Sequence, residues 1–493
     1  MPRFLSQALR SLSVSALAIA ALAGCSVGPD YERPALDLGA FFEQDQANPG
    51  WVPAAPSYAG SQQPWWLIFA DPALDALMVD LNAQNLSIEQ AQAQYEQALS
   101  TVRQTNAALY PTVGLTGDVT RADTAIVLPG TPVVAAGTGP FTEFAGNLGL
   151  SWEVDLWGAV ARRSESAQAT AQASAADLAG ARLSAQTALA STYFQVRVLD
   201  VQIELLDRTI DAHERSLKLT QNLAQAGLND PGDVAVAKTQ LESSRAQRYD
   251  VQWRRTQLEN AVAVLLGQTP ASFSLPPRPS FAIEPPLIPV GVPSTLLQRR
   301  PDIAAAERRT AAANAQIGVA TAAWFPELTI SATGGYRSRQ FAQWFSAPAQ
   351  FWALGPALAL AIFDGGRRQA QIEQAEAGFR AQAANYRLTA LRALQEVEDA
   401  LVQLHFLAQV QQAQAQAVAA GRESLRIRRN QYEQGLVDYL SVAVIETNLY
   451  NNQRNAINVM GDRLGASVRL VAALGGGWSV DELADAGNPV SPP

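Results

Sequence analysis

The stretch of this 493-residue chain that decides its fold is NLGLSWEVDL, residues 147–156. Apolar side chains occupy every second position, and the positions between them are polar or small. The apolar set is Leu148, Leu150, Trp152, Val154 and Leu156. A strict period of two over about ten residues is typical of a membrane β-barrel strand, with one face toward lipid and the other toward the lumen. A half-buried strand of a soluble sheet shows the same pattern, so one strand alone does not decide between the two.

Three further segments alternate in the same way. The four predicted strands cover residues 111–123, 143–156, 326–338 and 351–363, which makes two hairpins. Known bacterial barrels begin at about eight strands, and each unpaired backbone group at a strand edge in hydrocarbon costs several kcal/mol. Four strands therefore cannot close a barrel alone. We expect copies of the chain to share one sheet, and three copies would give twelve strands.

The two hairpins belong to two similar halves of the chain. Residues 158–267 recur weakly, at one fixed offset, in residues 366–475. The first repeat is expected over 73–267, with helices over 73–109, 158–226 and 232–266; the second is expected over 301–475, with helices over 301–324, 367–434 and 438–473. The period is far too long for a solenoid, so this is one chain built of two similar halves.

The long helices carry coiled-coil seams. In two of them a set of mostly apolar residues falls at alternating spacings of three and four, the period of a coiled coil. These residues are Val196, Leu199, Ile203, Leu206, Ile210, His213, Leu217, Thr220 and Ala224, and Val234, Ala237, Leu241, Ser244, Arg248, Val251, Arg255, Leu258, Val262 and Leu265. A second apolar line runs beside the first, so a helix can pack on two neighbours, as the wall of an α-barrel requires. An antiparallel bundle or a structural coiled coil would show the same seams. We interpret His213 and His405 as packing residues.

Composition argues against several functions. The formal net charge is −9, which argues against nucleic acid as a partner. The chain has two histidines and one cysteine, and it lacks a Gly-rich phosphate loop and an HExxH motif, so we predict no enzyme, no metal site and no cofactor. Beyond the first 24 residues, no stretch approaches the roughly 20 apolar residues of a membrane-spanning helix. If the chain crosses a membrane, we expect it to do so with strands.

The first 24 residues are expected to be a leader peptide. Arg3 and Arg10 precede and flank an apolar run that ends near Leu22. The sequence Leu22-Ala23-Gly24-Cys25 resembles a bacterial lipobox, which implies removal of residues 1–24 and a covalent lipid on Cys25. Ser26 is compatible with sorting to the outer membrane. An ordinary signal peptide with a chance cysteine is the alternative.

Short motifs are spread over nearly the whole mature chain. They are Cys25-Ser26-Val27-Gly28-Pro29-Asp30-Tyr31, Trp65-Trp66 with Asp71-Pro72, Arg299-Arg300-Pro301-Asp302-Ile303, Ala313-Asn314-Ala315, Phe325-Pro326 and Glu396-Val397-Glu398. Together they resemble the NodT-type outer-membrane factor lipoproteins. The resemblance implies a mainly α fold with transmembrane β structure: a TolC-like homotrimer with a twelve-stranded β-barrel in the outer membrane, a twelve-helix α-barrel through the periplasm and a mixed equatorial belt.

The resemblance also implies the remaining segments and the partners. Residues 25–72 would be a lipidated strap, 268–300 a connector in the belt and 476–493 a C-terminal tail. The trimer, in contact with outer-membrane lipid, would dock onto a periplasmic adaptor protein and an RND-type inner-membrane pump. It would act as the passive exit channel of their efflux system.

Family members contact the adaptor and constrict the pore at the helix turns. The resemblance therefore implies adaptor-contact tips at Gly227, Leu228, Gly435 and Leu436, and a periplasmic gate at Leu440, Asp438, Tyr439 and Tyr432. The family often has an acid where this chain has Val444, so Asp438 is the acidic candidate here. Asp230 and Asp233 are possible tip acids or ordinary solvated turn residues, and both glycines also fit plain helix C-caps.

Two other functions stay open from the sequence. The chain could be a structural lipoprotein whose coiled coil only spans the periplasm, or an exit duct for type I protein secretion. A structural spacer leaves the four alternating strands unexplained.

Overall fold

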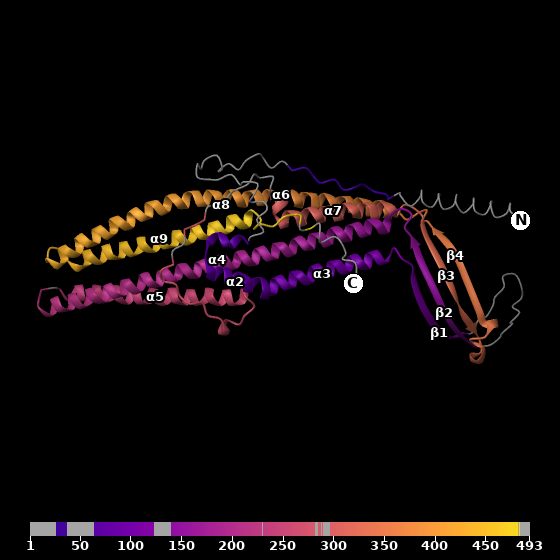
Figure 1. Ribbon diagram of the computed structural model, residues 1–493, viewed down its shortest axis with the longest axis horizontal. Coiled ribbons are helices and arrows are strands. Elements are labelled where there is room, and N and C mark those ends of the chain that lie inside the picture. Colours follow the sequence, from indigo (N-terminus) through magenta and orange to yellow (C-terminus); the bar gives the residue numbers. More distant parts are fainter. Residues whose placement is uncertain are drawn as a thin grey trace. The chain divides into compact units, whose positions relative to one another are not determined.

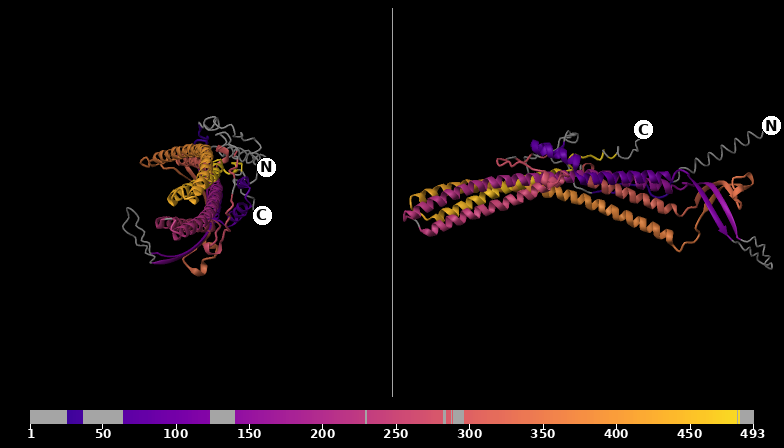
Figure 2. Two further views of the ribbon diagram at one scale, coloured as in Figure 1. Left: turned by 90° about the vertical axis from the view of Figure 1, so that its left-hand side faces the viewer. Right: turned by 90° about the horizontal axis from the view of Figure 1, so that it is seen from below.

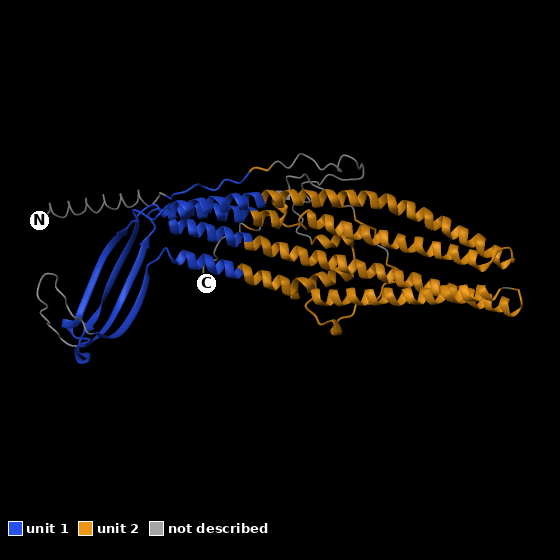
Figure 3. Ribbon diagram, turned by 180° about the vertical axis from the view of Figure 1, so that it is seen from behind, with its two compact units in different colours: residues 1–34, 96–173, 307–385 blue, residues 35–95, 174–306, 386–493 orange. Residues whose placement is uncertain are grey.

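The computed structural model describes residues 26–36, 64–122, 140–228, 230–281, 284–286, 288, 296–481 and 483. The predicted leader, Cys25 and the last part of the predicted tail lie outside these residues. The chain divides into two compact units, which Figure 3 shows in different colours: residues 1–34, 96–173 and 307–385, and residues 35–95, 174–306 and 386–493.

The first unit contains one antiparallel sheet in the order β1-β2-β3-β4 (Figure 1). Its strands are β1 (Thr112–Ala122), β2 (Phe141–Val154), β3 (Glu327–Ser338) and β4 (Gln350–Ala359). The register aligns Val113 with Leu150, Leu150 with Ala332, and Ala332 with Leu354. Because side chains alternate along each strand, the apolar sets of all four strands share one face, and the polar and small residues share the other. The alternation predicted from the sequence is confirmed.

The apolar face of this sheet is open. Leu115 is 81% exposed, Trp352 78% and Leu354 69%, although all three are large and apolar. Within the described part of the chain, β1 and β4 each pair along one side only, so both edges of the sheet are unpaired.

The fourth strand is shorter than predicted. Residues 351–363 alternate in the sequence, but β4 ends at Ala359. Ala359 pairs with Glu327, the first residue of β3, so the residues that follow have no partner on β3. Ile362 and Phe363 are 93% and 91% exposed as a result.

The helix predicted over 73–109 is in fact two helices, α2 (Pro72–Gln84) and α3 (Leu86–Ala107). Asn85 separates them with an extended backbone, at ψ 120. Its Oδ1 accepts hydrogen bonds from the backbone N–H groups of Ser87 and Ile88, both at 3.0 Å, which caps α3. Its Nδ2 donates to the carbonyl oxygen of Leu265 at 2.7 Å.

The second unit is built mainly from parts of long helices, which run alongside one another in Figure 2. The main helices are α4 (Ala159–Gln225), α5 (Pro231–Leu265), α8 (Arg367–Glu433) and α9 (Tyr439–Ala473). The other helical elements in the described residues are α6 (Leu296–Arg299), α7 (Pro301–Ala322) and the short 3₁₀ turns η3 (Trp65–Phe69), η4 (Pro270–Ser272), η6 (Phe341–Gln343) and η7 (Ala347–Ala349). None of the helices in the described residues is long and apolar enough to cross a membrane.

The predicted coiled-coil seams form the packing surfaces of α4 and α5. Every seam position is buried or half-buried, and Val196, Leu206, Ala237 and Val262 are buried completely or nearly so. At about 25 cal/mol per Å² of apolar surface, such continuous lines supply most of the stability of a long helix pair. The three-and-four spacing read from the sequence therefore identifies the residues that pack in the structure.

A buried ionic network fixes the connector to these helices. Asp200 is fully buried and accepts from Arg197 at 2.9 Å, from Arg255 at 2.6 Å and from the backbone N–H of Arg278 at 3.0 Å. Arg255 also donates to the carbonyl oxygen of Leu275 at 2.6 Å. Removal of one partner from such a network leaves a buried charge uncompensated, which costs about 3–5 kcal/mol.

Candidate functional site

The two helix turns of the second unit have the same backbone geometry. Gly227 and Gly435 have φ of +74 and +71, the left-handed conformation that glycine adopts without strain. Leu228 N–H donates to the Leu223 carbonyl and Leu436 N–H to the Gln431 carbonyl, both at 2.9 Å. This is the Schellman C-cap. Leu228 and Leu436 are 73% and 68% exposed, so both turns present a leucine to the surroundings.

The predicted tip acids cap the helices that follow the turns. Asp230 accepts from Gly232 N–H at 2.7 Å and begins α5. Asp438 accepts from the N–H of Ser441 at 3.0 Å and from its Oγ at 2.6 Å, and these bonds hold the pKa of Asp438 below its usual value. Both carboxylates are therefore N-caps, in addition to any role of their charge.

Carboxylates from both turns lie close together. Burial raises the pKa of Asp233, and the negative charges of Asp438 and Asp230 raise it further. Asp438 belongs to the second turn and the other two to the first, so negative charge from both turns acts on Asp233.

Tyr432 and Tyr439 lie inside the packing between the helix pairs. They are 6% and 1% exposed, and their rings meet edge to face at 5.6 Å between centroids. They form one apolar cluster with Ala237 of α5 and with Val442 and Ala443 of α9. In the single chain these tyrosines anchor the turns to each other and face no open space.

Leu440 is placed differently from the tyrosines. It is 53% exposed, and Val444, one helical turn later on the same face of α9, is 49% exposed. Of the four residues implied for the gate, Leu440 is therefore the exposed apolar one and Asp438 the exposed charged one.

A buried polar cluster lies near the turns and was not predicted from the sequence. His213 of α4 is 5% exposed, and its Nδ1 lies 3.0 Å from Ser244 Oγ of α5. Its Nε2 lies 3.6 Å from Glu446 of α9, which also accepts from Arg429 of α8 at 2.6 Å. Burial lowers the pKa of His213, against the opposing effect of Glu446. The sequence feature that could have indicated this cluster is Glu446, an acidic residue that falls at the coiled-coil spacing between the apolar residues Val442 and Leu449.

The comparisons with known proteins fit this geometry. The model of the family described as outer membrane efflux protein matches residues 77–268 and 292–476, one match for each half of the chain. The chain belongs to the outer membrane efflux protein family.

The relatives of this efflux protein match nearly its whole length. It is 30% identical to the toluene efflux pump outer membrane protein TtgC of Pseudomonas putida, over 96% of each chain. It is 27% identical to the cation efflux system protein CusC of Escherichia coli, over 93% of this chain and 97% of that one. The solved structure of the outer-membrane channel OprN matches with a TM-score of 0.84 at 28% identity, over 92% of this chain and all of the other.

Family membership settles the class of function. This protein is an outer-membrane exit channel of an efflux system, it extends into the periplasm, and it is not an enzyme. Its fold is that of the TolC-like channels, mainly helical with a four-stranded antiparallel contribution to the membrane part. Proteins of this family act as trimers with partner pump components.

The first described residues of the channel are held tightly on the first unit. Arg162 of α4, which is 5% exposed, donates to the carbonyl of Val27 at 3.3 Å and to Asp30 at 2.8 Å. Gly28 adopts φ +96, and a Cβ there would lie 2.4 Å from the Cα of Gly318. Only glycine fits at this crossing, so the residues just after Cys25 have one fixed path.

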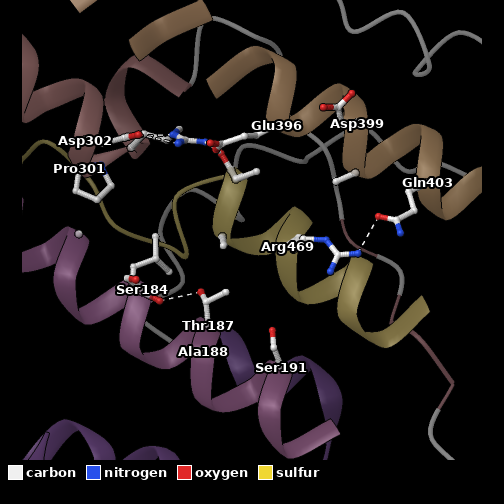
Figure 4. A pocket seen from close by; sticks show the side chains of 16 residues that line it. Ser184, Thr187, Ala188, Ser191, Pro301, Asp302, Glu396, Asp399, Gln403 and Arg469 are labelled. Carbon is white, nitrogen blue, oxygen red and sulfur yellow. Dashed lines mark hydrogen bonds and ion pairs between the residues drawn. The ribbon is translucent and has the colours of Figure 1, made fainter. Parts of the chain in front are cut away.

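The motif around Arg300 fixes the start of α7 in the second unit. Arg300 forms a two-bonded pair with Asp302 at 3.0 and 2.7 Å, and it donates to Glu396 at 2.7 Å and to the Ala473 carbonyl at 3.0 Å. These contacts border a hollow of about 720 Å³ between α4, α8 and α9 (Figure 4). Across it, Arg469 donates to Gln403 at 2.8 Å. The guanidinium group of Arg300 is thus paired with carboxylates and a carbonyl oxygen of the same chain. We assign the motif a structural role.

In the part of the chain that the structure describes, no group of three or more His, Cys, Asp and Glu side chains is arranged to hold a metal ion.

Proposed function

We propose that three copies of this channel form a duct that is closed at the helix turns by Leu440 and opens when the turns move apart. The support for three copies is the unpaired edge of β1 and of β4. At several kcal/mol for each unsatisfied backbone group in hydrocarbon, these edges have to pair with those of neighbouring copies. Twelve strands then make one closed sheet.

The observation that supports the gate is the exposure of Leu440 beside buried Tyr439. The tyrosine is part of the packed cluster, whereas Leu440 and Val444 project from the same helix with about half of their surface uncovered. In a three-fold ring, three leucines at one height form an apolar constriction, and such constrictions resist hydrated ions by dewetting.

The test is the ion conductance of purified protein in planar bilayers. Leu440→Ala should raise the leak through the closed channel several-fold. Gly232→Ala, at the equivalent position of the first turn, should leave the leak unchanged. Equal leak in wild type and Leu440→Ala would overturn the gate assignment, and a complete lack of conductance in every variant would favour a structural spacer.

The proposed partners are a periplasmic adaptor protein and an RND-type inner-membrane pump, which supplies the energy. The exposed leucines of the two Schellman turns, Leu228 and Leu436, support docking at the turns, since they are apolar and lie beyond the last helical turn. The efflux names of the relatives favour small solutes over secreted proteins as cargo.

Covalent lipid on Cys25 is part of the same proposal. The support for lipidation is the tight packing of the segment that begins at Ser26. This packing holds the residues after Cys25 next to the end of β2, beside the strands of the first unit. Cys25→Ser should abolish incorporation of labelled palmitate, while the strand content of the isolated protein stays unchanged.

A further inference from the structure

The loop between β3 and β4 carries three aromatic side chains, Phe341, Trp344 and Phe345. Hereafter these three residues are called the aromatic loop. A loop at the mouth of a barrel can fold over the lumen, as a lid, or outward over the lipid-facing side. The two arrangements place the aromatic side chains on opposite faces of the sheet.

The aromatic loop contacts a small set of residues on β2 and β3. Phe341 and Trp344 lie 5.4 and 5.9 Å from Phe144, measured between ring centroids. Phe345 lies 5.7 Å from Tyr336, and Trp344 Nε1 donates to the Tyr336 carbonyl at 3.2 Å. A Cβ on Gly146 would lie 3.2 Å from the Trp344 ring, so glycine makes room for the indole.

The strand register assigns these contacts to one face. Gly146 aligns with Tyr336 and Gly117, and Phe144 aligns with Val119. Both residues are an even number of positions from Leu148, so they share the apolar face with it. The aromatic loop therefore packs on the same face as Leu115, Trp352 and Leu354.

The opposite face is occupied by charged residues at this end of the sheet. Arg337 lies 3.5 Å from Glu143 and stacks over Phe351 at 5.2 Å. Arg339, just before the aromatic loop, stacks over Phe141 at 4.1 Å. Arg337 and Glu143 belong to the polar, lumen-facing set by register, together with Phe141 and Phe351, so the charged residues lie on the lumen side whereas the aromatic loop packs on the other face.

The aromatic loop is also exposed and lies at the outer end of the barrel. Phe341 and Phe345 are 68% and 72% exposed, and they continue the uncovered apolar face of the sheet. The loop follows the end of β3 that is remote from α7, and the helices of this family extend into the periplasm. Aromatic side chains suit this level because their rings accept both acyl chains and the polar boundary.

We propose that the aromatic loop inserts into the outer leaflet of the outer membrane and contacts lipid acyl chains, and that it is not a lid of the channel. The occupant of this surface is lipid because the surface is continuous with the membrane face of the strands. The proposal depends on the outer-membrane location of the sheet and is independent of the gate at Leu440.

Single cysteines with an environment-sensitive fluorophore test the proposal on the full-length protein in liposomes. Cys25 is the only cysteine, so the labelled wild type gives the background. Phe345→Cys reports on the aromatic loop, Leu354→Cys on the apolar face and Thr333→Cys on the polar face. Quenching is measured with nitroxide-labelled acyl chains and, separately, with aqueous iodide.

Phe345→Cys should match Leu354→Cys, with strong quenching by the nitroxide lipid and little by iodide. Quenching by iodide alone, as expected of Thr333→Cys, would overturn the proposal in favour of a lid. Protection from both quenchers would also overturn it, because a neighbouring copy would then cover the loop. If the Leu354→Cys control itself lacked lipid quenching, the membrane location of the sheet would be wrong and the loop proposal would be overturned with it, whereas lipid quenching of Leu354→Cys without that of Phe345→Cys would overturn the loop proposal alone.

Conductance gives a second, independent measurement. The double variant Phe341→Ala/Phe345→Ala should keep the single-channel conductance of the wild type in planar bilayers. A conductance increase of several-fold would identify the loop as a lid and contradict the proposal.

Discussion

The turn between α4 and α5 and the turn between α8 and α9 share one backbone design but differ in the side chains that follow it. Both end the first helix with a glycine in a Schellman cap, and both begin the second helix with an aspartate cap, Asp230 or Asp438. After the cap, the first turn continues with Pro231-Gly232 and the second with Tyr439-Leu440. The first turn thus has the residues of a plain helix start, and the second has a buried anchor and an exposed leucine.

We infer from this difference that the two copies of the turn have different roles. Proline at the first helical position and a neighbouring glycine give a compact turn without large side chains. Tyr439 fills the space between the helix pairs, which fixes the direction in which Leu440 leaves α9. We expect the second turn to control the pore and the first to support it.

The largest expected effect is that of Tyr439→Ala. Loss of a buried aromatic side chain costs about 3–5 kcal/mol, and here the loss is local to the contact between the turns. Amide hydrogen exchange over residues 430–450 should therefore become much faster, with increased leak in bilayers. Tyr439→Phe should have a much smaller effect than Tyr439→Ala, since it keeps the buried ring and removes only the hydroxyl, which contacts Glu446 at 3.5 Å. Pro231→Ala, the matching change in the first turn, should have little effect, and equal effects of both alanine variants would contradict the proposed division of roles.

The next largest effect is expected when a negative charge is introduced at a turn glycine. Gly435→Asp places a carboxylate beside the exposed Leu436, in a conformation that costs a non-glycine residue about 1–2 kcal/mol. Efflux of the pump's substrate by cells that carry this variant should fall while trimers remain intact on native gels. Gly227→Asp makes the same change in the first turn at a nearly identical φ, and it should also lower efflux because both turns are proposed docking sites. Normal efflux in both variants would show that the turns are not the docking surface.

A smaller effect is expected from the caps themselves. Asp438→Ala removes the acceptor for Ser441 N–H, so the first turn of α9 should exchange its amide hydrogens several-fold faster. Asp438→Asn keeps the cap and removes the charge. If the acids where the turns meet favour cations, the asparagine variant should lower cation selectivity, measured as a reversal potential, without the increase in exchange. An unchanged reversal potential would show that Asp438 acts as a helix cap and does not contribute to ion selectivity.

Periodicity made most of this fold predictable, because strand and helix periods are local properties of the chain. The strands, the duplicated helices and the seams from Val196 to Leu265 followed from spacing alone. Features that depend on distant residues did not: the break at Asn85 depends on Leu265, and the end of β4 depends on where β3 begins. In the same way, Tyr439 could be placed beside the second helix turn from the sequence, but its burial results from packing against another helix pair.

The smallest expected effect is a dependence on pH through His213, which joins both helix pairs. Burial holds the pKa of His213 below its usual value of about 6.5, so the folded state favours the neutral ring. The unfolded chain therefore binds more protons in the window between the lowered value and about 6.5, and stability rises with pH in that window.

As pH falls from about 7.5 to 5.5, the contact of His213 with Ser244 and Glu446 should weaken. The attraction of Glu446 opposes this change and Arg429 assists it, which keeps the effect small. The protection factors of amides near the turns, which are corrected for the intrinsic slowing of exchange as pH falls, should decrease over this range in the wild type. His213→Gln keeps a hydrogen-bonding group but cannot titrate there, so its protection factors should depend less on pH. The same pH dependence in both proteins would show that another group controls the contact between the helix pairs.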